Sequence, residues 1–224
     1  GNGISIINAN SKSVINNTFF SNLRSPQLNS GEGLLGGINI YNSEVIIKNC
    51  NFTNNKGEDF LNIISSNFLI ENVKMDKINF DAIDFDFSKG TIDGISIYNA
   101  GNDALDFSGS NVFAKNILIN KAGDKGVSAG EQSKIKISNI DINKSNIGIA
   151  SKDLSTVEVN NIEVEGSNIV AAAYQKKPEF GPGFIEIKKI NISNNENTYL
   201  AQKNSVIKVN NEIMSNTNIN YSEF

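Results

Sequence analysis

Short stretches in which apolar and polar residues alternate recur along the whole chain. Between residues 104 and 121 three of them follow one another, "ALDFS", "VFAKN" and "ILINK". Alternation over about four to six residues is typical of a β-strand with one buried face. The pattern therefore predicts many short strands, which follow one another too closely to leave room for a helix.

The alternating stretches repeat with a fixed period. Asp59, Asp81 and Asp103 are spaced by 22 residues, and each opens a segment of the same design. A second set of equivalent positions, one in each repeat, forms a column between the second and third stretches. Its spacing is nearly the same, except for one longer step before Lys189. Asparagine and glycine, which dominate this column, readily adopt the left-handed backbone of a sharp corner. The column consists of Asn49, Asn72, Gly94, Asn116, Asn139, Asn161, Lys189 and Asn211.

These features predict an all-β fold: a right-handed parallel β-helix (solenoid) of about nine rungs, with 22–23 residues and three strands in each rung. A leucine-rich repeat requires Leu at several fixed positions and one strand per repeat, and this sequence supplies neither. Left-handed hexapeptide helices have a shorter period. We expect one domain over residues 1–224, a fragment of a longer protein, with insertions near 23–32 and 174–183 and an irregular tail over 212–224.

Alternation also sorts the side chains of the first strand in each rung. In "AIDFDF" it places Ile83, Phe85 and Phe87 inside, and therefore Asp84 and Asp86 outside. Three outward columns follow from the repeat. One holds the small residues Ala82, Ala104, Gly126, Gly148 and Ala171; the second holds Asn62, Asp84, Asp106, Ser128 and Ala150; the third holds Ile64, Asp86, Ser108, Gly130, Lys152 and Gln175.

These columns predict a shallow groove on the first sheet, with a floor of small residues. Acids line one end of it, and Lys125, Lys152, Lys176 and Lys177 line the other. The insertion at residues 174–183 is expected to form a wall, because loops on a rigid scaffold commonly carry function. The candidate substrate-binding residues are Asp86, Asp103, Asp124, Ser128, Glu131, Asp153, Tyr174, Gln175 and Lys176.

The acidic columns allow three kinds of chemistry. Asp84 and Asp106 lie on adjacent rungs, so their carboxylates are expected about 5 Å apart. Ca²⁺ bridged by Asp84, Asp86 and Asp106 would suit hard oxygen ligands, whereas a shared proton would resemble the carboxylate pair of a retaining glycosidase. The third outcome is a solvated column screened by Lys125 or water.

Two lysines are candidate catalytic bases beside the catalytic pair Asp84 and Asp106. Lys125 lies at the corner before the strand, and Lys152 lies two rungs from Asp106, about 10 Å away by strand spacing. A lysine base requires a lowered pKa. The neighbouring Asp153 would raise the pKa of Lys152, which argues against this role.

Composition narrows the function classes. The net charge of −4 offers no surface for nucleic acid, and no apolar run reaches the roughly 18 residues of a membrane span. Because histidine is absent, a Ser-His-Asp triad is excluded and transition-metal catalysis is disfavoured. Arg24, the only arginine, is placed in a loop, which argues against an arginine-based lyase site, and the single Cys50 is expected to be a small buried residue.

Four phrases between about Asp81 and Glu186 carry a resemblance: "NDALDFSGS", "AGDKGVSAGE", "GIASKDLS" and "AAAYQKKPEFGPG". They resemble a right-handed β-helix region of bacterial surface or secreted proteins, some of which also carry a spore-coat CotH-like kinase module. The architecture at large is similar to that of pectate lyases, polygalacturonases and alginate epimerases. The absence of histidine departs from the polygalacturonase pattern, and the absence of arginine in the groove departs from the main pectate lyase pattern.

The leading hypothesis is an extracytoplasmic, non-catalytic module that presents its groove to a polysaccharide or a cell-envelope glycan. Such a module is expected outside the cell, on its surface or in the periplasm, beside other domains of one chain, without nucleic-acid partners or membrane insertion. The first alternative is a carbohydrate-active enzyme, either a uronate polysaccharide lyase or epimerase or a glycoside hydrolase. The second alternative is a segment of a phage or adhesin fibre.

Overall fold

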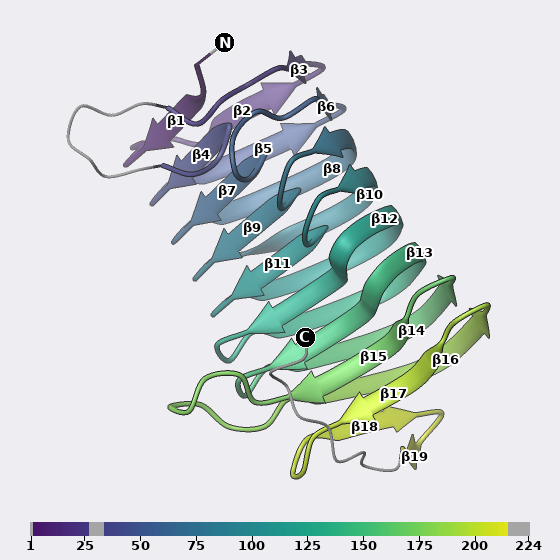
Figure 1. Ribbon diagram of the computed structural model, residues 1–224. Helices are drawn as coiled ribbons and strands as arrows, with labels where there is room; N and C mark the ends of the chain where they lie inside the picture. Colours follow the sequence, from purple (N-terminus) through teal and green to yellow (C-terminus); the bar gives the residue numbers. More distant parts are fainter. Residues whose placement is uncertain (1, 27–33, 215–224) are drawn as a thin grey trace.

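The computed structural model describes residues 2–26 and 34–214, which form an all-β solenoid without a helix (Figure 1). The strands are β1 (Ile4–Ile7), β2 (Ser13–Asn16), β3 (Phe19–Ser21), β4 (Ile38–Tyr41), β5 (Glu44–Lys48), β6 (Asn51–Thr53), β7 (Leu61–Ile64), β8 (Asn67–Ile78), β9 (Ile83–Asp86), β10 (Lys89–Ala100), β11 (Leu105–Ser108), β12 (Asn111–Gly130), β13 (Lys134–Lys152), β14 (Thr156–Glu165), β15 (Ile169–Tyr174), β16 (Phe184–Ser193), β17 (Asn197–Ala201), β18 (Val206–Val209) and β19 (Glu212–Ile213).

Apart from β19, the strands pair in parallel with the strands of the neighbouring turns. The predicted parallel β-helix is therefore confirmed, with about eight turns rather than nine, because the last turn is incomplete. Among the described residues, three separate strands per turn occur only in the first two turns, β1 to β3 and β4 to β6. In later turns the second and third stretches merge into one bent strand, and β12 and β13 also continue into the first sheet of the next turn (Figure 1).

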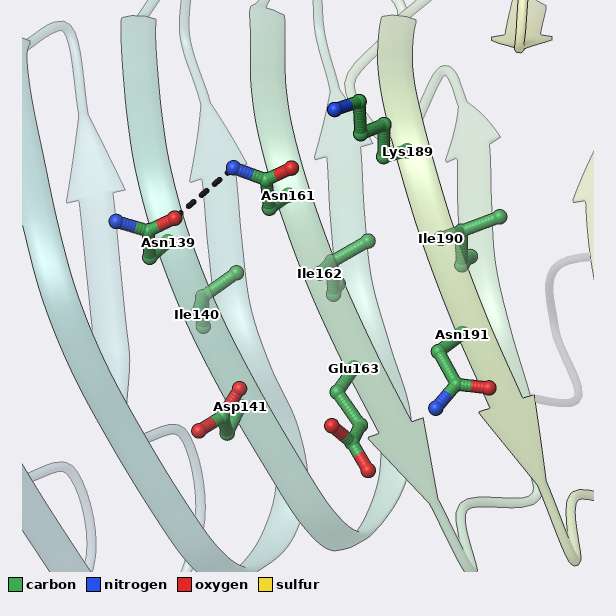
Figure 2. A pocket seen from close by; sticks show the side chains of 9 residues that line it. All are labelled: Asn139, Ile140, Asp141, Asn161, Ile162, Glu163, Lys189, Ile190 and Asn191. Carbon is green, nitrogen blue, oxygen red and sulfur yellow. Dashed lines mark hydrogen bonds between the residues drawn. The ribbon is translucent and has the colours of Figure 1, made fainter.

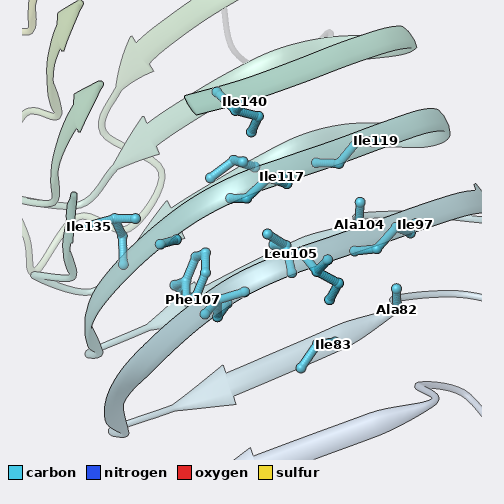
Figure 3. Close-up of a cluster of buried hydrophobic side chains, with 14 of the residues drawn as sticks. Ala82, Ile83, Ile97, Ala104, Leu105, Phe107, Ile117, Ile119, Ile135 and Ile140 are labelled. Atoms are coloured by element: carbon cyan, nitrogen blue, oxygen red, sulfur yellow. The ribbon is translucent and has the colours of Figure 1, made fainter. Parts of the chain in front are cut away.

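Inward side chains of all sheets meet in one apolar core that runs along the axis (Figure 3). Like residues stack on like residues because paired positions are one turn apart. The ring of Phe85 stacks on that of Phe107 at 4.8 Å between centroids and lies 4.7 Å from that of Phe68. Cys50 is buried with a free thiol, as expected. Stacked isoleucine and phenylalanine side chains exclude water over the whole length of the rod.

The predicted column of small residues faces this core and not the solvent. Ala82 and Ala104 are fully buried within it. A Cβ added to Gly126 would lie 3.0 Å from the Cδ1 atom of Ile142, a core residue of the third stretch. The side chains of this column are small because the core residues of the third stretch on the opposite side leave no more space. It ends in Val170, not Ala171, because Ala171 pairs with Ile149 one position further along the strand.

The corners between stretches use left-handed backbone, as the sequence predicts. Asn49, Asn72, Gly94 and Asn116 have φ values of 52°, 50°, 77° and 56°. The corner then opens out, since Asn139 and Asn161 are not among the residues with positive φ, yet their amides remain hydrogen-bonded at 2.9 Å. Amide hydrogen bonds thus join neighbouring asparagines of the column in both halves of the rod, Asn72 to Asn49 at 2.8 Å in the first half and Asn161 to Asn139 in the second.

A second left-handed corner follows the first sheet and corrects one prediction. Phe87 does not point inside; it has a φ of 49° and is 61 % exposed. The alternation of inward and outward side chains ends with β9 at Asp86, because residue 87 forms the corner itself. A bulky residue with positive φ is a genuine outlier that costs of order 1–3 kcal/mol. The same corner is occupied in other turns by Asn42, Ser65, Gly109, Glu131 and Asp153.

Directly after this corner lies a ladder of buried serines that the sequence reasoning missed. Each hydroxyl accepts the backbone N–H of the equivalent residue one turn earlier, which is Ala9 for Ser43 and a serine for the others; Ser110, for example, accepts from Ser88 at 2.9 Å. The Ser110 hydroxyl also donates to the carbonyl of Phe85 at 2.9 Å. The ladder therefore satisfies buried backbone groups where the chain leaves the sheet. It consists of Ser43, Ser66, Ser88, Ser110, Ser133 and Ser155.

The predicted insertions lie between strands in the sequence. The one near residues 23–32 lies between β3 and β4, and residues 27–33 lie outside the described residues. The insertion at 174–183 lies between β15 and β16. The first residues of the expected irregular tail are regular. β19 pairs antiparallel with β18, and Met214 N donates to Ile207 O at 2.9 Å. Residues 215–224 lie outside the described part.

Replacing Ser110 with alanine tests the serine ladder. Ser110→Ala leaves the buried N–H of Ser88 without its acceptor, which should lower the free energy of unfolding by about 1–3 kcal/mol. Urea denaturation followed by circular dichroism measures the change. Ser96→Ala, on the outer face of β10, is the matched control and should have little effect. Equal stability of Ser110→Ala and wild type would contradict a stabilising ladder.

Candidate functional site

The outer face of the first sheet brings the predicted acidic residues together. β9 and β11 pair so that Asp84 lies opposite Asp106 and Asp86 opposite Ser108. The side chains of Asp84, Asp86 and Asp106 are all partly exposed. We call this surface the acidic strip; it consists of Asp59, Asp81, Asp84, Asp86, Asp103 and Asp106. Strand register is what juxtaposes the carboxylates, since positions that pair here are one full turn apart in sequence.

Asn62 extends the strip by one turn. It lies opposite Asp84, and its amide donates to Asp84 Oδ2 at 3.1 Å and to Asp59 Oδ2 at 3.4 Å. Asn62 is 4 % exposed, and its Oδ1 atom has no hydrogen-bond partner in the protein. The Oδ1 atom of Asp106 is likewise buried without such a partner. Neither acceptor atom therefore takes part in a hydrogen bond within the protein, although Lys152 Nζ lies 4.0 Å from Asp106 Oδ1 as an ion pair.

At the corner before the strip, carboxylates cap the backbone of the following turn. Asp81 Oδ1 accepts the N–H of Asp103 at 2.8 Å, and Asp103 Oδ1 accepts the N–H of Lys125 at 2.9 Å. The amide of Asn102 adds a 2.7 Å bond to Asp81 Oδ1. Asp103, predicted to bind substrate, is 3 % exposed. It is thus a supporting residue of the strip in this geometry.

Burial sets the protonation of the strip. It raises the pKa of Asp84 to about 9, with further contributions from the charges of Asp86 and Asp106. Burial likewise raises the pKa of Asp59 and of Asp103 to about 7, and it raises the pKa of Asp86. At neutral pH Asp84 therefore carries a proton, and its carboxyl group both donates and accepts hydrogen bonds.

Lys125 is held as a cation. Its Nζ atom is bonded to Asp124 and lies 3.6 Å from Asp103 Oδ1, with an 11 % exposed side chain. Burial alone would lower the pKa of Lys125, but the charges of Asp103 and Asp124 outweigh it and raise the pKa above its usual value. This direction is opposite to the one that a catalytic lysine base requires.

Lys152 lies closer to Asp106 than strand spacing alone predicts. Its Nζ atom is 4.0 Å from Asp106 Oδ1 and donates to Ser128 Oγ at 2.9 Å. The reach is explained by the aliphatic stem, which lies across the preceding turn; a Cβ at Gly130 would be 2.9 Å from Lys152 Cε. Glycine at position 130 therefore allows the lysine to cross back toward the acids. The repeat pattern could not show this.

The segment 174–183 is anchored to the solenoid by Asp153. Asp153 is fully buried, and its Oδ1 atom accepts the N–H groups of Lys176 and Lys177 at 2.7 and 2.8 Å. Its carboxylate thus supports the loop. The sequence predicted that it would instead act on the amine of Lys152. Of the two loop lysines, Lys177 pairs with Glu131, whereas Lys176 is exposed.

Gln175 completes the support of this loop. Its side-chain amide donates to Phe180 O at 2.6 Å, and its backbone N–H donates to Gln202 Oε1, also at 2.6 Å. The position opposite Lys152 is Tyr174, not Gln175 as expected, because β15 pairs with β13 one residue earlier. The loop is therefore a braced wall at one end of the first sheet.

The lysine half of the predicted groove floor is covered. Ser128 and Ala150 point outward, yet both are fully buried. Ala150 belongs to a second apolar cluster on the outer side of the sheet, against which Leu200 packs; its buried members are Ile147, Ala150, Ile169, Ala172 and Tyr174. Burial raises the pKa of Tyr174 to about 12, which keeps it neutral. The accessible part of the first sheet is therefore the acidic strip with Lys152 at its border.

Within residues 2–26 and 34–214, no group of three or more His, Cys, Asp or Glu side chains converges as metal ligands do. The calcium site at Asp84, Asp86 and Asp106 stays a prediction.

Three hollows lie outside the strip. One of about 290 Å³ follows the asparagine corner of β13, β14 and β16, where Asn161 is bonded to Asn139 beside Asp141 and Glu163 (Figure 2). A second of about 350 Å³ lies at the same corner of earlier turns. The third, of about 520 Å³, borders the strip between Phe87 and Phe180. Alternation could not identify this last site, because both phenylalanines lie outside strands.

Residues 36–180 match the family model described as a right-handed β-helix region. Together with the parallel solenoid, this match defines the class of protein: the chain belongs to the right-handed β-helix family. Comparison with curated proteins and with solved structures gives no match. In the part of the chain that the structure describes, no helix has the length and apolar character needed to cross a membrane.

The raised pKa values predict an unusual pH dependence of stability. Unfolded aspartates titrate near 3.8, so between pH 4 and 9 the folded strip binds more protons than the unfolded chain, and stability falls as pH rises. One retained proton contributes up to about 1.4 kcal/mol per pH unit. Urea denaturation from pH 5 to 9 should show this decline, and Asp84→Asn should flatten it. Asp93→Asn, whose partly exposed carboxylate has a lowered pKa, should not; a stability that rises from pH 5 to 9 would refute the assignment.

Proposed function

We propose that this β-helix module binds a glycan, without turning it over, on the acidic strip and the side chains at its border. The observation that carries the proposal is the partly exposed row of Asp84, Asp86 and Asp106, which Lys152 borders and beside which Asn62 Oδ1 has no hydrogen-bond partner in the protein. Protein surfaces usually satisfy buried acceptors internally or through water. Sugar hydroxyl groups supply suitable donors, and Asp84 in its protonated form can serve either role.

The charge of the strip favours a neutral glycan over a uronate polymer. Asp86 and Asp106 add to the negative field that raises the pKa of Asp84. A polymer with one carboxylate per sugar would experience the same repulsion. Lys152 lies beside Asp106, so part of its positive charge is compensated within the protein. Neutral hexose or N-acetylhexosamine chains meet no such penalty.

The setting of the module is part of the proposal. We place it outside the cytoplasm, in the extracellular space, on the cell surface or in the periplasm, with a polysaccharide or cell-envelope glycan as its partner. The support is the resemblance of residues 81–186 to β-helix regions of bacterial surface and secreted proteins, including those that carry a CotH-like kinase module. Other domains of the same chain would then bring the module to its target.

A second candidate function is glycoside hydrolysis by Asp84 and Asp106. The two residues are directly opposite on paired parallel strands. The pKa of Asp84, raised to about 9, keeps this carboxyl group protonated at neutral pH, the state in which a general acid must start. Asp106 would then act as nucleophile. The lyase alternative has less support, because the pKa of Lys125 is raised and Lys152 donates a hydrogen bond to Ser128.

Binding and turnover are separated by one titration series. The probes are cellohexaose, mannohexaose, N-acetylchitohexaose and, as an anionic counterpart, hexagalacturonate, each with and without Ca²⁺. We expect calorimetry to detect at least one neutral probe, with affinity lowered five-fold or more in Asp106→Asn and Lys152→Gln. Chromatography of the same mixtures should show no cleaved product.

The matched controls are Lys136→Gln and Asp141→Asn, which change exposed charges on other faces of the solenoid and should bind as wild type does. Cleavage that is lost in both Asp84→Asn and Asp106→Asn would establish the hydrolase instead. Preference for hexagalacturonate in the presence of Ca²⁺ would favour the calcium site and a uronate ligand. Absence of binding to every probe would refute the proposed function.

A further inference from the structure

A strained, exposed phenylalanine stands where the acidic strip ends. Phe87 directly follows Asp86 and occupies a corner whose other members are Asn42, Ser65, Gly109, Glu131 and Asp153. It is the bulkiest side chain in this ladder, its φ is 49°, and it is 61 % exposed. Strained backbone at an exposed apolar residue indicates a role other than packing.

The next turn is shaped to receive the ring of Phe87. A Cβ built on Gly109 would lie 2.6 and 2.8 Å from two ring carbons of Phe87. Gly109 itself has a φ of 62°. Because no side chain projects from residue 109, the ring lies against the backbone of the following turn. Its orientation is therefore fixed although its surface is open to solvent.

A hollow of about 520 Å³ lies at this ring and is closed on another side by Phe180. Phe180 belongs to the 174–183 loop, where its carbonyl accepts the Gln175 amide at 2.6 Å and its N–H donates to Lys177 O at 3.1 Å. Leu154 N donates to Gly181 O at 3.1 Å, which ties this end of the loop to the solenoid. The second aromatic wall is thus held by the protein.

Polar groups line the rest of the Phe87–Phe180 hollow. They come from Asn111, Glu131, Gln132 and Lys134. Glu131 is paired with Lys177 from the loop, so its charge is compensated. Two aromatic rings with amide and paired charged groups around them suit a ligand that has both C–H faces and hydroxyl groups. The volume lies in the range of about 300–1,000 Å³ that small-molecule sites occupy.

We infer that the Phe87–Phe180 hollow is a subsite for a neutral sugar ring, with Phe87 as the stacking platform and Phe180 as the opposite wall. The face of an aromatic ring is electronegative and attracts the polarised C–H groups on one side of a pyranose. Hydroxyl groups at the ring edge meet Asn111 and Gln132. The inference rests on the proposed function, because a glycan that lies on the strip at Asp86 and Ser108 continues directly into this hollow.

The variant Phe87→Asn tests the inference with and without ligand. Asparagine occupies the same corner at Asn42 with a φ of 45°, so the replacement should relieve strain and raise the melting temperature by a few degrees. It should also weaken binding of the neutral hexasaccharide probe five-fold or more. Lowered stability or unchanged affinity would overturn the inference. Phe180→Ala, in the loop, should weaken binding in the same way, whereas Phe113→Ala, an exposed ring on β12, should not.

Nuclear magnetic resonance of protein with ¹³C-labelled phenylalanine distinguishes the two failures. In titrations with cellohexaose, mannohexaose and N-acetylchitohexaose, the ring signals of Phe87 and Phe180 should shift and those of Phe113 should not. Shifts confined to amides of the acidic strip would overturn the subsite and leave the proposed function standing. Shifts confined to the two rings would support the subsite and refute binding on the strip. Absence of both would overturn both.

Discussion

Parallel hydrogen bonding between successive turns is the constraint on which the rest of this molecule depends. Each strand donates to and accepts from the strands one turn away, so every turn must supply nearly the same length of chain to keep its partners in register. Extra residues are accommodated only where no pairing is required. The segment 174–183 leaves the sheet after β15, yet Asn161 still pairs with Lys189 in the next turn. The same constraint that stacks the core therefore projects this loop beside the strip.

Register also explains how much the sequence could predict. A constant repeat length and alternation by two suffice to place Asp84 opposite Asp106 and Phe85 opposite Phe107, since both follow from backbone pairing alone. Alternation does not mark where a strand ends. Phe87 therefore had the spacing of a core residue, but its left-handed backbone turns its side chain away from the core. Ala82 and Ala104, predicted to face outward, belong to the core because the chain bends at these positions.

Side-chain reach and loop contacts were the other limits of prediction. The distance from Lys152 to Asp106 depends on a four-carbon stem that crosses Gly130, and strand spacing contains no such information. Asp153 was expected beside Lys152's amine, but the loop supplies two N–H groups that orient its carboxylate. The position of a long side chain or an inserted segment depends on how it packs against the rest of the protein. Alternation and repeat length in the sequence contain no information about this packing.

The serine ladder and the acidic strip are both stacked columns of polar residues, but they differ in how well their hydrogen bonds are satisfied. The serine ladder is satisfied in both directions, since a hydroxyl such as that of Ser110 accepts from one turn and donates to a carbonyl. The acidic strip is not satisfied in this way: several carboxylates lie close together there, the pKa of Asp84 is raised, and the Oδ1 atoms of Asn62 and Asp106 have no hydrogen bond within the protein. A purely structural column could have used serine at these positions as well. The strip thus keeps polar groups in an arrangement that burial and charge repulsion disfavour.

The dimensions of the face limit what such a site can achieve. β11 has four residues, and a strand rises about 3.3 Å per residue, so the path from Asp103 across the strip to the Phe87–Phe180 hollow is on the order of 15 Å. Under the proposed function, only a few sugar rings would fit along this path. A short contact with hydroxyl-rich ligands displaces ordered water for modest gain, so the affinity of one module is expected to be weak. Strong attachment to a polymer would then require several sites bound at once, by repeated modules or by other glycan-binding domains, because linked sites raise the effective concentration of the second contact.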